Sequence, residues 1–256
     1  MDAGFAALLL LVAVGSWFQT LTGFGLGMIV VGAASALGLA PLASLATLVN
    51  LVSLPQYALA LRGCSAHIAW RLAVPAVLGM LPSIALGVAL LDRLDGRTAL
   101  ALQALLGAVI VHSALGLARR PLPLPAPSAP RSFLASGLAG GLMSGLFGMP
   151  GPPLIFHFYR QPLALAQIRS MLLVVFTAMS LWRTLASALQ GQFDAGLGLQ
   201  AAAALPVMGA ATLLARRFPP PLSPAAMRRL AYGMLTAIGG ALTLQALWSL
   251  ATAAQG

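Results

Sequence analysis

Hydrophobic residues fill most of the chain in ten separate stretches, which glycine, proline and polar residues divide. The stretches are residues 3–18, 26–39, 42–61, 68–91, 98–118, 132–147, 152–159, 163–189, 195–215 and 225–250. Six of them reach the roughly 20 residues that a helix needs to cross a bilayer. A chain inside a bilayer satisfies its backbone hydrogen bonds as helices or as a closed barrel, and apolar runs of this length favour helices. The pattern therefore predicts an all-α membrane protein.

The composition supports a multi-pass membrane protein. Hydrophobic residues make up 60% and charged residues 7% of the chain, against about 25% charged in a soluble domain. The net charge is +10, with 14 basic residues that are all arginine. The arginines occupy short connections between apolar stretches and form no basic domain, so they read as topology signals. We therefore expect the lipid bilayer as a partner and no nucleic acid.

The chain is predicted to consist of two similar halves. Residues 119–131 contain five prolines, cannot be helical, and divide the first repeat, residues 1–118, from the second, residues 132–256. Each half has about five apolar segments, in which a short, broken pair precedes three longer ones. Gly23 and Pro41 of the first half have counterparts at nearly the same spacing in Gly145 and Pro162 of the second. This order favours a tandem duplication.

The arginines then predict how the halves are inserted. If each broken pair enters and leaves on one side while the other three segments span, 11 of the 14 arginines are cytoplasmic, as the positive-inside rule requires. Both termini then lie outside and the proline-rich linker is cytoplasmic. A single kinked crossing per broken pair would place the arginine pairs at 216–217 and 228–229 outside. The charges therefore favour inverted-topology repeats, and leave open whether the short segments are re-entrant hairpins or paired crossings.

Glycine-rich motifs interrupt the apolar pattern at residues 19–27 and 140–151. Broken backbone at membrane depth is tolerated where protein or a water-filled cavity satisfies it. The helix that starts after such a break offers unpaired N–H groups and a positive dipole end, which bind anions. We expect the two motifs to meet near the midplane around a polar cavity. The predicted substrate-binding residues there are Thr22, Gly23, Gly25, Gly27, Ser144, Gly145, Gly148 and Gly151.

Other glycines are more typical of close helix packing of the GxxxG kind. We assign that role to Gly32, Gly137, Gly141, Gly233 and Gly240, and it is also the alternative for the two motifs.

Three polar side chains within the apolar stretches add to this picture. Asn50 is a candidate substrate ligand, although an amide in a membrane helix can also serve an interhelical hydrogen bond, as we expect for Gln56. Arg169 follows the second motif, where it could bind a substrate anion with its guanidinium or snorkel to the cytoplasmic surface. Both interpretations of Arg169 stay open.

The motifs resemble a known family. Thr-Gly-Phe-Gly-Leu-Gly at residues 22–27 and Gly-Leu-Phe-Gly-Met-Pro-Gly-Pro-Pro at residues 145–153 are similar to motifs of the sulfite exporter TauE/SafE family of membrane permeases. The resemblance implies an exporter of small sulfur-containing anions such as sulfite, sulfoacetate or thiosulfate, located in the cell inner (cytoplasmic) membrane. Family members usually carry glycine where this chain has Pro150.

Two other classes of function compete with transport. Ser144 with His157 or His112 could imitate the Ser–His pair of an intramembrane enzyme, but Thr22, its counterpart in the first motif, has no neighbouring histidine. A membrane scaffold without transport is the other alternative. One cysteine, Cys64, three separated histidines and no glutamate predict no metal site and no cofactor. The anion, the direction, the coupling ion and the oligomeric state do not follow from the sequence.

Overall fold

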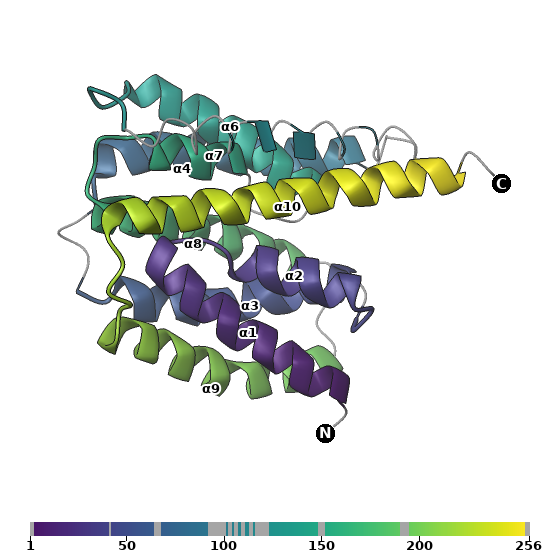
Figure 1. The fold of residues 1–256 in the computed structure, drawn as a ribbon. Helices are drawn as coiled ribbons and strands as arrows, with labels where there is room; N and C mark the ends of the chain where they lie inside the picture. Colours follow the sequence, from purple (N-terminus) through teal and green to yellow (C-terminus); the bar gives the residue numbers. More distant parts are fainter. Residues whose placement is uncertain are drawn as a thin grey trace. The chain divides into compact units, whose positions relative to one another are not determined.

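The computed structural model of the chain describes residues 3–40, 42–63, 68–91, 123–147, 152–189 and 195–253, with isolated positions between 101 and 115. These residues form α-helices joined by turns, and no strand occurs among them (Figure 1). The helices are α1 (Ala3–Thr22), α2 (Leu26–Ala36), α3 (Leu42–Leu61), α4 (Trp70–Leu91), α6 (Pro130–Phe147), α7 (Pro152–Tyr159), α8 (Leu165–Leu189), α9 (Ala195–Arg217) and α10 (Pro224–Ala253).

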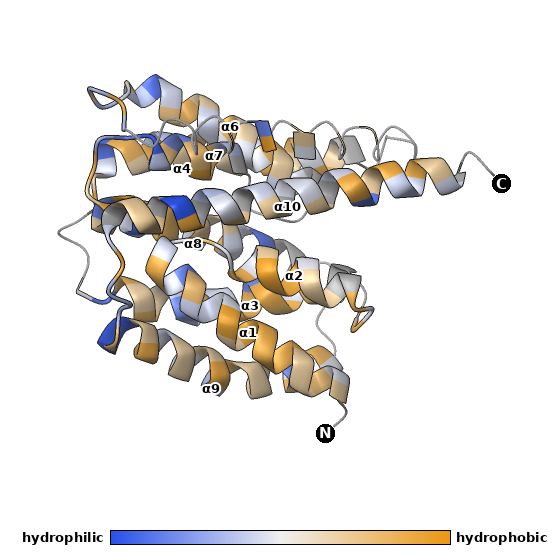
Figure 2. Ribbon diagram, viewed as in Figure 1, coloured by the Kyte–Doolittle hydropathy of each residue, from blue (hydrophilic) through white to orange (hydrophobic). Residues whose placement is uncertain are grey.

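Six of the described helices are long and apolar enough to cross a membrane, namely α1, α3, α4, α8, α9 and α10. Figure 2 shows hydrophobic residues along most of α9, with hydrophilic residues gathered at its C-terminal end. The prediction of an all-α membrane protein is confirmed.

The first helix is longer than its apolar stretch suggested. α1 has 20 residues, about 30 Å at 1.5 Å per residue, so the expectation of a short first segment is wrong for α1. The helix continues through Gln19, Thr20 and Thr22 because these polar side chains are buried and hydrogen-bonded. α2, with 11 residues, is too short to span.

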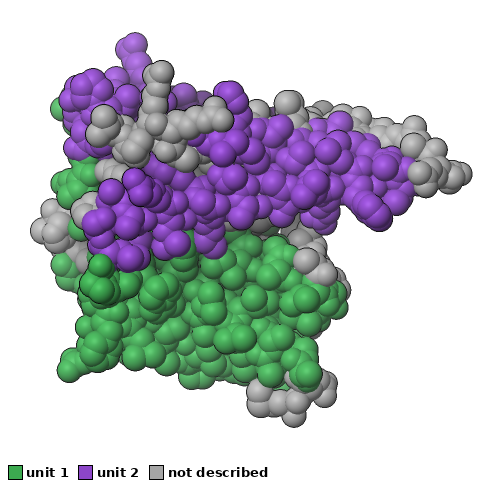
Figure 3. Space-filling view, in the orientation of Figure 1, with its two compact units in different colours: residues 1–77, 163–221 green, residues 78–162, 222–256 purple. Residues whose placement is uncertain are grey.

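The chain divides into two compact units, each of which is built from parts of both sequence halves. Unit 1 comprises Met1–Val77 and Leu163–Pro221, and unit 2 comprises Leu78–Pro162 and Leu222–Gly256 (Figure 3). The proposed repeats are continuous in sequence, whereas each unit combines segments of both halves. The units therefore do not test the boundaries of the repeats, which stay a prediction.

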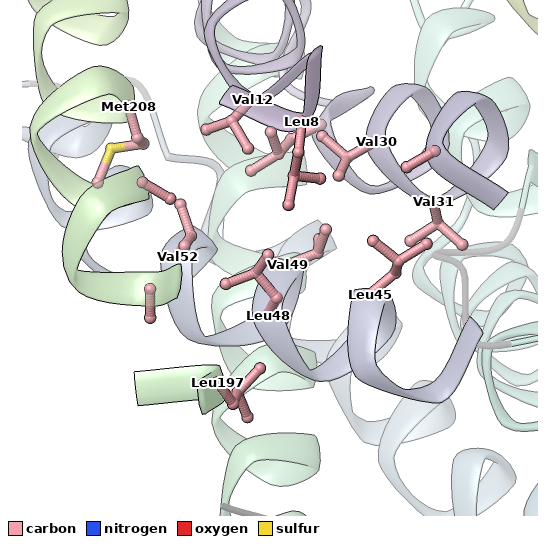
Figure 4. Close-up of a cluster of buried hydrophobic side chains, with 14 residues drawn as sticks. Leu8, Val12, Val30, Val31, Leu45, Leu48, Val49, Val52, Leu197 and Met208 are labelled. Atoms are coloured by element: carbon pink, nitrogen blue, oxygen red, sulfur yellow. The ribbon is translucent and has the colours of Figure 1, made fainter. Parts of the chain in front are cut away.

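In unit 1 the chain reverses direction at the first break. Leu8 and Val12 of α1 pack against Val30 and Val31 of α2 (Figure 4), while a Cβ on Gly15 would lie 2.9 Å from a methyl group of Leu26. Early residues of α1 thus meet late residues of α2, which makes the pair an antiparallel hairpin. α3 and α9 pack against this hairpin, and their contacts are apolar and close, as van der Waals packing in a bilayer requires.

In unit 2 glycines bring α4 and α6 together. A Cβ on Gly79 would strike the Leu134 carbonyl oxygen, and one on Gly141 would strike the Met80 carbonyl oxygen. The packing role predicted for Gly141 is therefore confirmed.

The same packing role is wrong for three other glycines. No atom lies within 4 Å of where a Cβ on Gly32, Gly233 or Gly240 would be, so none of these positions brings two helices of the described chain together.

The described part of the linker is non-helical, as its prolines predicted. Residues 123–129 precede α6 and are tied to the end of α7. Leu124 donates its N–H to the Arg160 carbonyl at 2.9 Å, and the Gln161 carboxamide accepts from the Ser128 N–H at 2.9 Å and donates to the Ser128 hydroxyl at 3.1 Å. These hydrogen bonds take the place of the helical backbone hydrogen bonds that a proline-rich segment cannot form.

Candidate anion site at the first helix break

The backbone between α1 and α2 has a geometry that glycine favours. Gly23 has a φ of 88° and Gly25 a φ of 121°, in the region that side chains with a Cβ rarely adopt. The Thr22 hydroxyl donates to the Phe18 carbonyl at 2.9 Å, lies 2.8 Å from the Phe24 carbonyl, and accepts from the Phe24 N–H at 3.4 Å. Thr22 thus satisfies part of the broken backbone.

A pair of buried carboxamides holds the start of α2. The Gln19 side-chain oxygen accepts the N–H of Leu26 at 3.0 Å, and its amide group donates to the Gln56 side-chain oxygen at 2.8 Å. Gln56 in turn donates to the Ser16 carbonyl at 2.8 Å, so the interhelical hydrogen bond predicted for Gln56 is confirmed. Sequence reasoning missed Gln19, although an amide four residues before Gly23 in an apolar helix needs a partner.

The first turn of α2 carries the backbone donors that the sequence predicted. The first hydrogen bond inside the helix runs from the Ile29 N–H to the Gly25 carbonyl at 2.9 Å. The helix itself therefore offers no acceptor to the N–H groups of Leu26, Gly27 and Met28. Gln19 satisfies Leu26, while Gly27 and Met28 lie at the positive end of the helix dipole.

Arg169 lies beside this break. A Cβ on Gly23 would be 2.9 Å from the Arg169 Cα and 3.0 Å from its carbonyl oxygen, so glycine at position 23 allows α8 to approach. The Arg169 guanidinium donates to the Thr20 carbonyl at 3.4 Å, and the side chain is half-buried. In sequence Arg169 follows the second motif, but the fold brings it to the first.

Asn50 joins two helices farther along unit 1. Its amide group donates to the Ala46 carbonyl at 2.7 Å, and its oxygen accepts from the Ser180 hydroxyl of α8 at 3.3 Å. Asn50 is six residues from Gln56 in α3, about 9 Å along the helix. Its predicted part in substrate binding stays a prediction.

The first break lies between the centre of α3 and the end of unit 1 that bears Arg216. Arg216, in the last turn of α9, donates to the carbonyls of Leu59 and Arg62 at the end of α3, at 2.8 Å for Arg62. Gln56 is five residues before that end, about 8 Å. Measured along α3, Gln56 is thus about as far from this end as from the helix centre, and the position of the motifs near the midplane stays a prediction.

The second motif is described in part. Ser144 is fully buried in α6, and a Cβ on Gly145 would lie 2.8 Å from the Gly87 Cα and 2.9 Å from the Val88 N in α4. Gly145 therefore has the close-packing environment that was the alternative for the motifs. Gly148 and Gly151 fall outside the described residues, and the part of these motif residues in binding stays a prediction.

The histidine of the alternative Ser–His pair, His157, contacts a different serine, Ser132. The His157 Nε2 lies 3.1 Å from the Ser132 hydroxyl, which itself donates to the Ala129 carbonyl at 2.7 Å. The Ser132 hydrogen is used on that carbonyl, so the imidazole nitrogen acts as the donor and not as a base for this hydroxyl. Within the described residues, no group of three or more His, Cys, Asp or Glu could hold a metal ion.

Apolar helices of membrane-spanning length, a buried helix break and an arginine beside it define a multi-pass helical membrane protein with a candidate anion site. The chain belongs to the family described as Sulfite exporter TauE/SafE, whose model matches residues 7–242. It is 53% identical over 237 residues to the probable sulfite/organosulfonate exporter TauE of Cupriavidus necator, and the match covers 93% of each chain. No solved structure matches the chain. The family identifies the protein as a membrane anion exporter and not an enzyme.

Proposed function

We propose that the protein exports sulfite or small organosulfonate anions from the cytoplasm across the inner membrane. The observation that carries this proposal is the 53% identity, over 93% of both chains, to a relative named as a sulfite/organosulfonate exporter. The first break supports it, because Arg169 and the start of α2 bring positive charge and N–H donors to one place in a membrane protein with few charges.

The anion would bind first at the end of unit 1 that bears the arginines. Arg169 offers a planar guanidinium that fits two oxygens of a sulfite or sulfonate group. Gly27 and Met28 offer backbone donors at the positive end of α2. Ser144, Gly145, Gly148 and Gly151 would contribute equivalent groups from the second motif, although Pro152 and Pro153 at the start of α7 supply no N–H.

We also propose that the halves are inverted repeats and that both termini lie outside. The packing within each unit supports a duplication: α1 packs against α9 in unit 1, and α4 packs against α6 in unit 2. In each case the first segment of one half meets the fourth segment of the other. This pattern is expected if the two halves are copies of one ancestral fold and each packs its first segment against the fourth segment of the other half.

The proposal is tested with purified protein in liposomes loaded with labelled sulfite or sulfoacetate, under an imposed potential or pH step. We expect efflux well above that from loaded liposomes without the protein, and slower efflux for Arg169→Ala. Arg217→Ala is the matched control, because Arg217 is exposed at the end of α9 and stacks on Phe218. Failure to move either anion in either direction, under any gradient, would refute the proposed function.

A further inference from the structure

A group of uncharged polar side chains is buried between α1, α3 and α8. The hydroxyl of Tyr57, a residue 3% exposed, interacts with polar side chains from all three helices, namely Gln19, Ser53 and Ser180. Ser180 also donates to Asn50. We call Gln19, Asn50, Ser53, Tyr57 and Ser180 the polar cluster.

We propose that the polar cluster is a second, uncharged binding site for the transported oxyanion, and that Tyr57 is the donor that selects it. This inference rests on the proposed function and extends it to residues that neither glycine motif contains, apart from Gln19 at the border of the first.

The position of the polar cluster suits a site on the path of the anion. Arg169 and Ser180 are eleven residues apart in α8, about 17 Å along the helix, which is roughly half the bilayer core. Asn50 lies next to the centre of α3, which spans Leu42–Leu61. The polar cluster thus extends from the break, where Gln19 lies, to the middle of the membrane-spanning helices.

Packing alone does not account for polar residues at this place. The neighbouring core of unit 1 is apolar (Figure 4), and polar groups in membrane helices are costly. An interhelical hydrogen bond in a bilayer returns only about 0.6 kcal/mol on average. Apolar side chains would fill the same space at lower cost, so the polar cluster points to a ligand.

An additional buried hydroxyl supports a ligand on the same helices. Within the described residues the Ser16 side-chain oxygen is buried and has no hydrogen-bond partner. Ser16 and Gln19 are three residues apart and so share a face of α1. The Ser16 carbonyl already accepts from Gln56, which places this residue at the border of the polar cluster.

The chemistry of the polar cluster fits an anion with several oxygens. Every member can donate a hydrogen bond, and a hydroxyl can rotate from a protein acceptor to an oxygen of the substrate. Sulfite and sulfonates present three oxygens in a pyramid, whereas chloride presents one atom. Uncharged donors bind such an anion without an ion pair, so that it can also leave, as a permeation site requires.

The first test replaces Tyr57 by phenylalanine. Tyr232→Phe is the matched control, because its hydroxyl is also buried but donates to the Tyr159 carbonyl, at 3.4 Å, in unit 2. We expect Tyr57→Phe to raise the half-saturating sulfite concentration about tenfold and to reduce the preference for sulfite over chloride. Tyr232→Phe should stay within about twofold of the unmodified protein.

A second pair of variants guards against a folding defect. Ser180→Ala should also weaken sulfite transport, while Ser83→Ala should not, because the Ser83 hydroxyl donates within its own helix to the carbonyls of Gly79 and Met80. All variants are compared by elution profile and thermal unfolding. Unchanged affinity and selectivity in well-folded Tyr57→Phe and Ser180→Ala would overturn the inference while sulfite transport by the unmodified protein still upheld the proposed function.

Discussion

Gly23 combines two demands that a single residue type can meet. Its φ of 88° is strained for a residue with a Cβ, and its lack of a side chain admits the backbone of Arg169. The local conformation and the contact between distant segments therefore depend on the same position.

We expect Gly23→Ala to lower the free energy of unfolding by about 2 kcal/mol, because left-handed backbone strain and a close backbone contact add. Gly32→Ala is the control, since no atom lies within 4 Å of its added Cβ and its backbone is helical. It should be neutral or slightly stabilising. Thermal unfolding in detergent measures both, and equal melting temperatures would contradict the role assigned to Gly23.

Gln19 and Gln56 should act as one unit. Gln19→Leu leaves the Leu26 N–H and the Gln56 side chain without their partner, at a cost of about 1–3 kcal/mol. Adding Gln56→Leu should cost much less than the same change in the unmodified protein, because the shared bond is already lost. A double-mutant cycle of unfolding free energies gives the coupling, and additive effects would show that the two amides act independently.

Sequence reasoning predicted some of these residues and missed others for physical reasons. The Gly23 and Gly25 break and the hydrogen-bonding role of Gln56 followed from local chemistry. The contact between Gly23 and Arg169 did not, because it depends on how α8 packs in unit 1. Gln19 was overlooked because its partners, Leu26 and Gln56, are set by the hairpin and by α3.

At the level of helices, the apolar pattern located the elements and ended α1 too early. Residues 42–61 form α3 as predicted, and residues 195–215 extend by two to give α9 (Ala195–Arg217). α1 extends beyond its apolar stretch because buried Thr20 and Thr22 return their hydroxyls to the carbonyls of their own helix. A hydropathy pattern does not take account of such hydrogen bonds within the helix, so it predicts the end of α1 too early.

The contact between α4 and α6 supplies a prediction at this scale. Gly141→Val should separate the two helices and destabilise the protein by about 2–3 kcal/mol, since a Cβ there would strike the Met80 carbonyl. Gly209→Val in α9 is the control, because an added Cβ at Gly209 would lie in open space. Thermal melts and proteolysis rates should distinguish them, and similar values for both variants would argue against packing as the function of Gly141.

For the whole molecule, the inverted-repeat topology predicts on which side the linker lies. Ala126, exposed in the linker, is replaced by cysteine in a Cys64→Ser background, with Ala3→Cys at the start of α1 as the opposite marker. An impermeant thiol reagent added to intact cells should label Ala3→Cys and leave Ala126→Cys unlabelled until the membrane is opened. The reverse pattern would refute the topology.

If the anion binds at the start of α2 as we propose, Gln19 competes with it for the same donors. Its side-chain oxygen already occupies the first donor of α2, and because it is tethered three residues before the end of α1 its effective concentration at that donor is high. An arriving anion would gain only the difference between its own hydrogen bonds and those of the amide that it displaces. Affinity at the entrance would thereby be held down, and the amide would return when the anion moves on, which favours rapid turnover over tight capture.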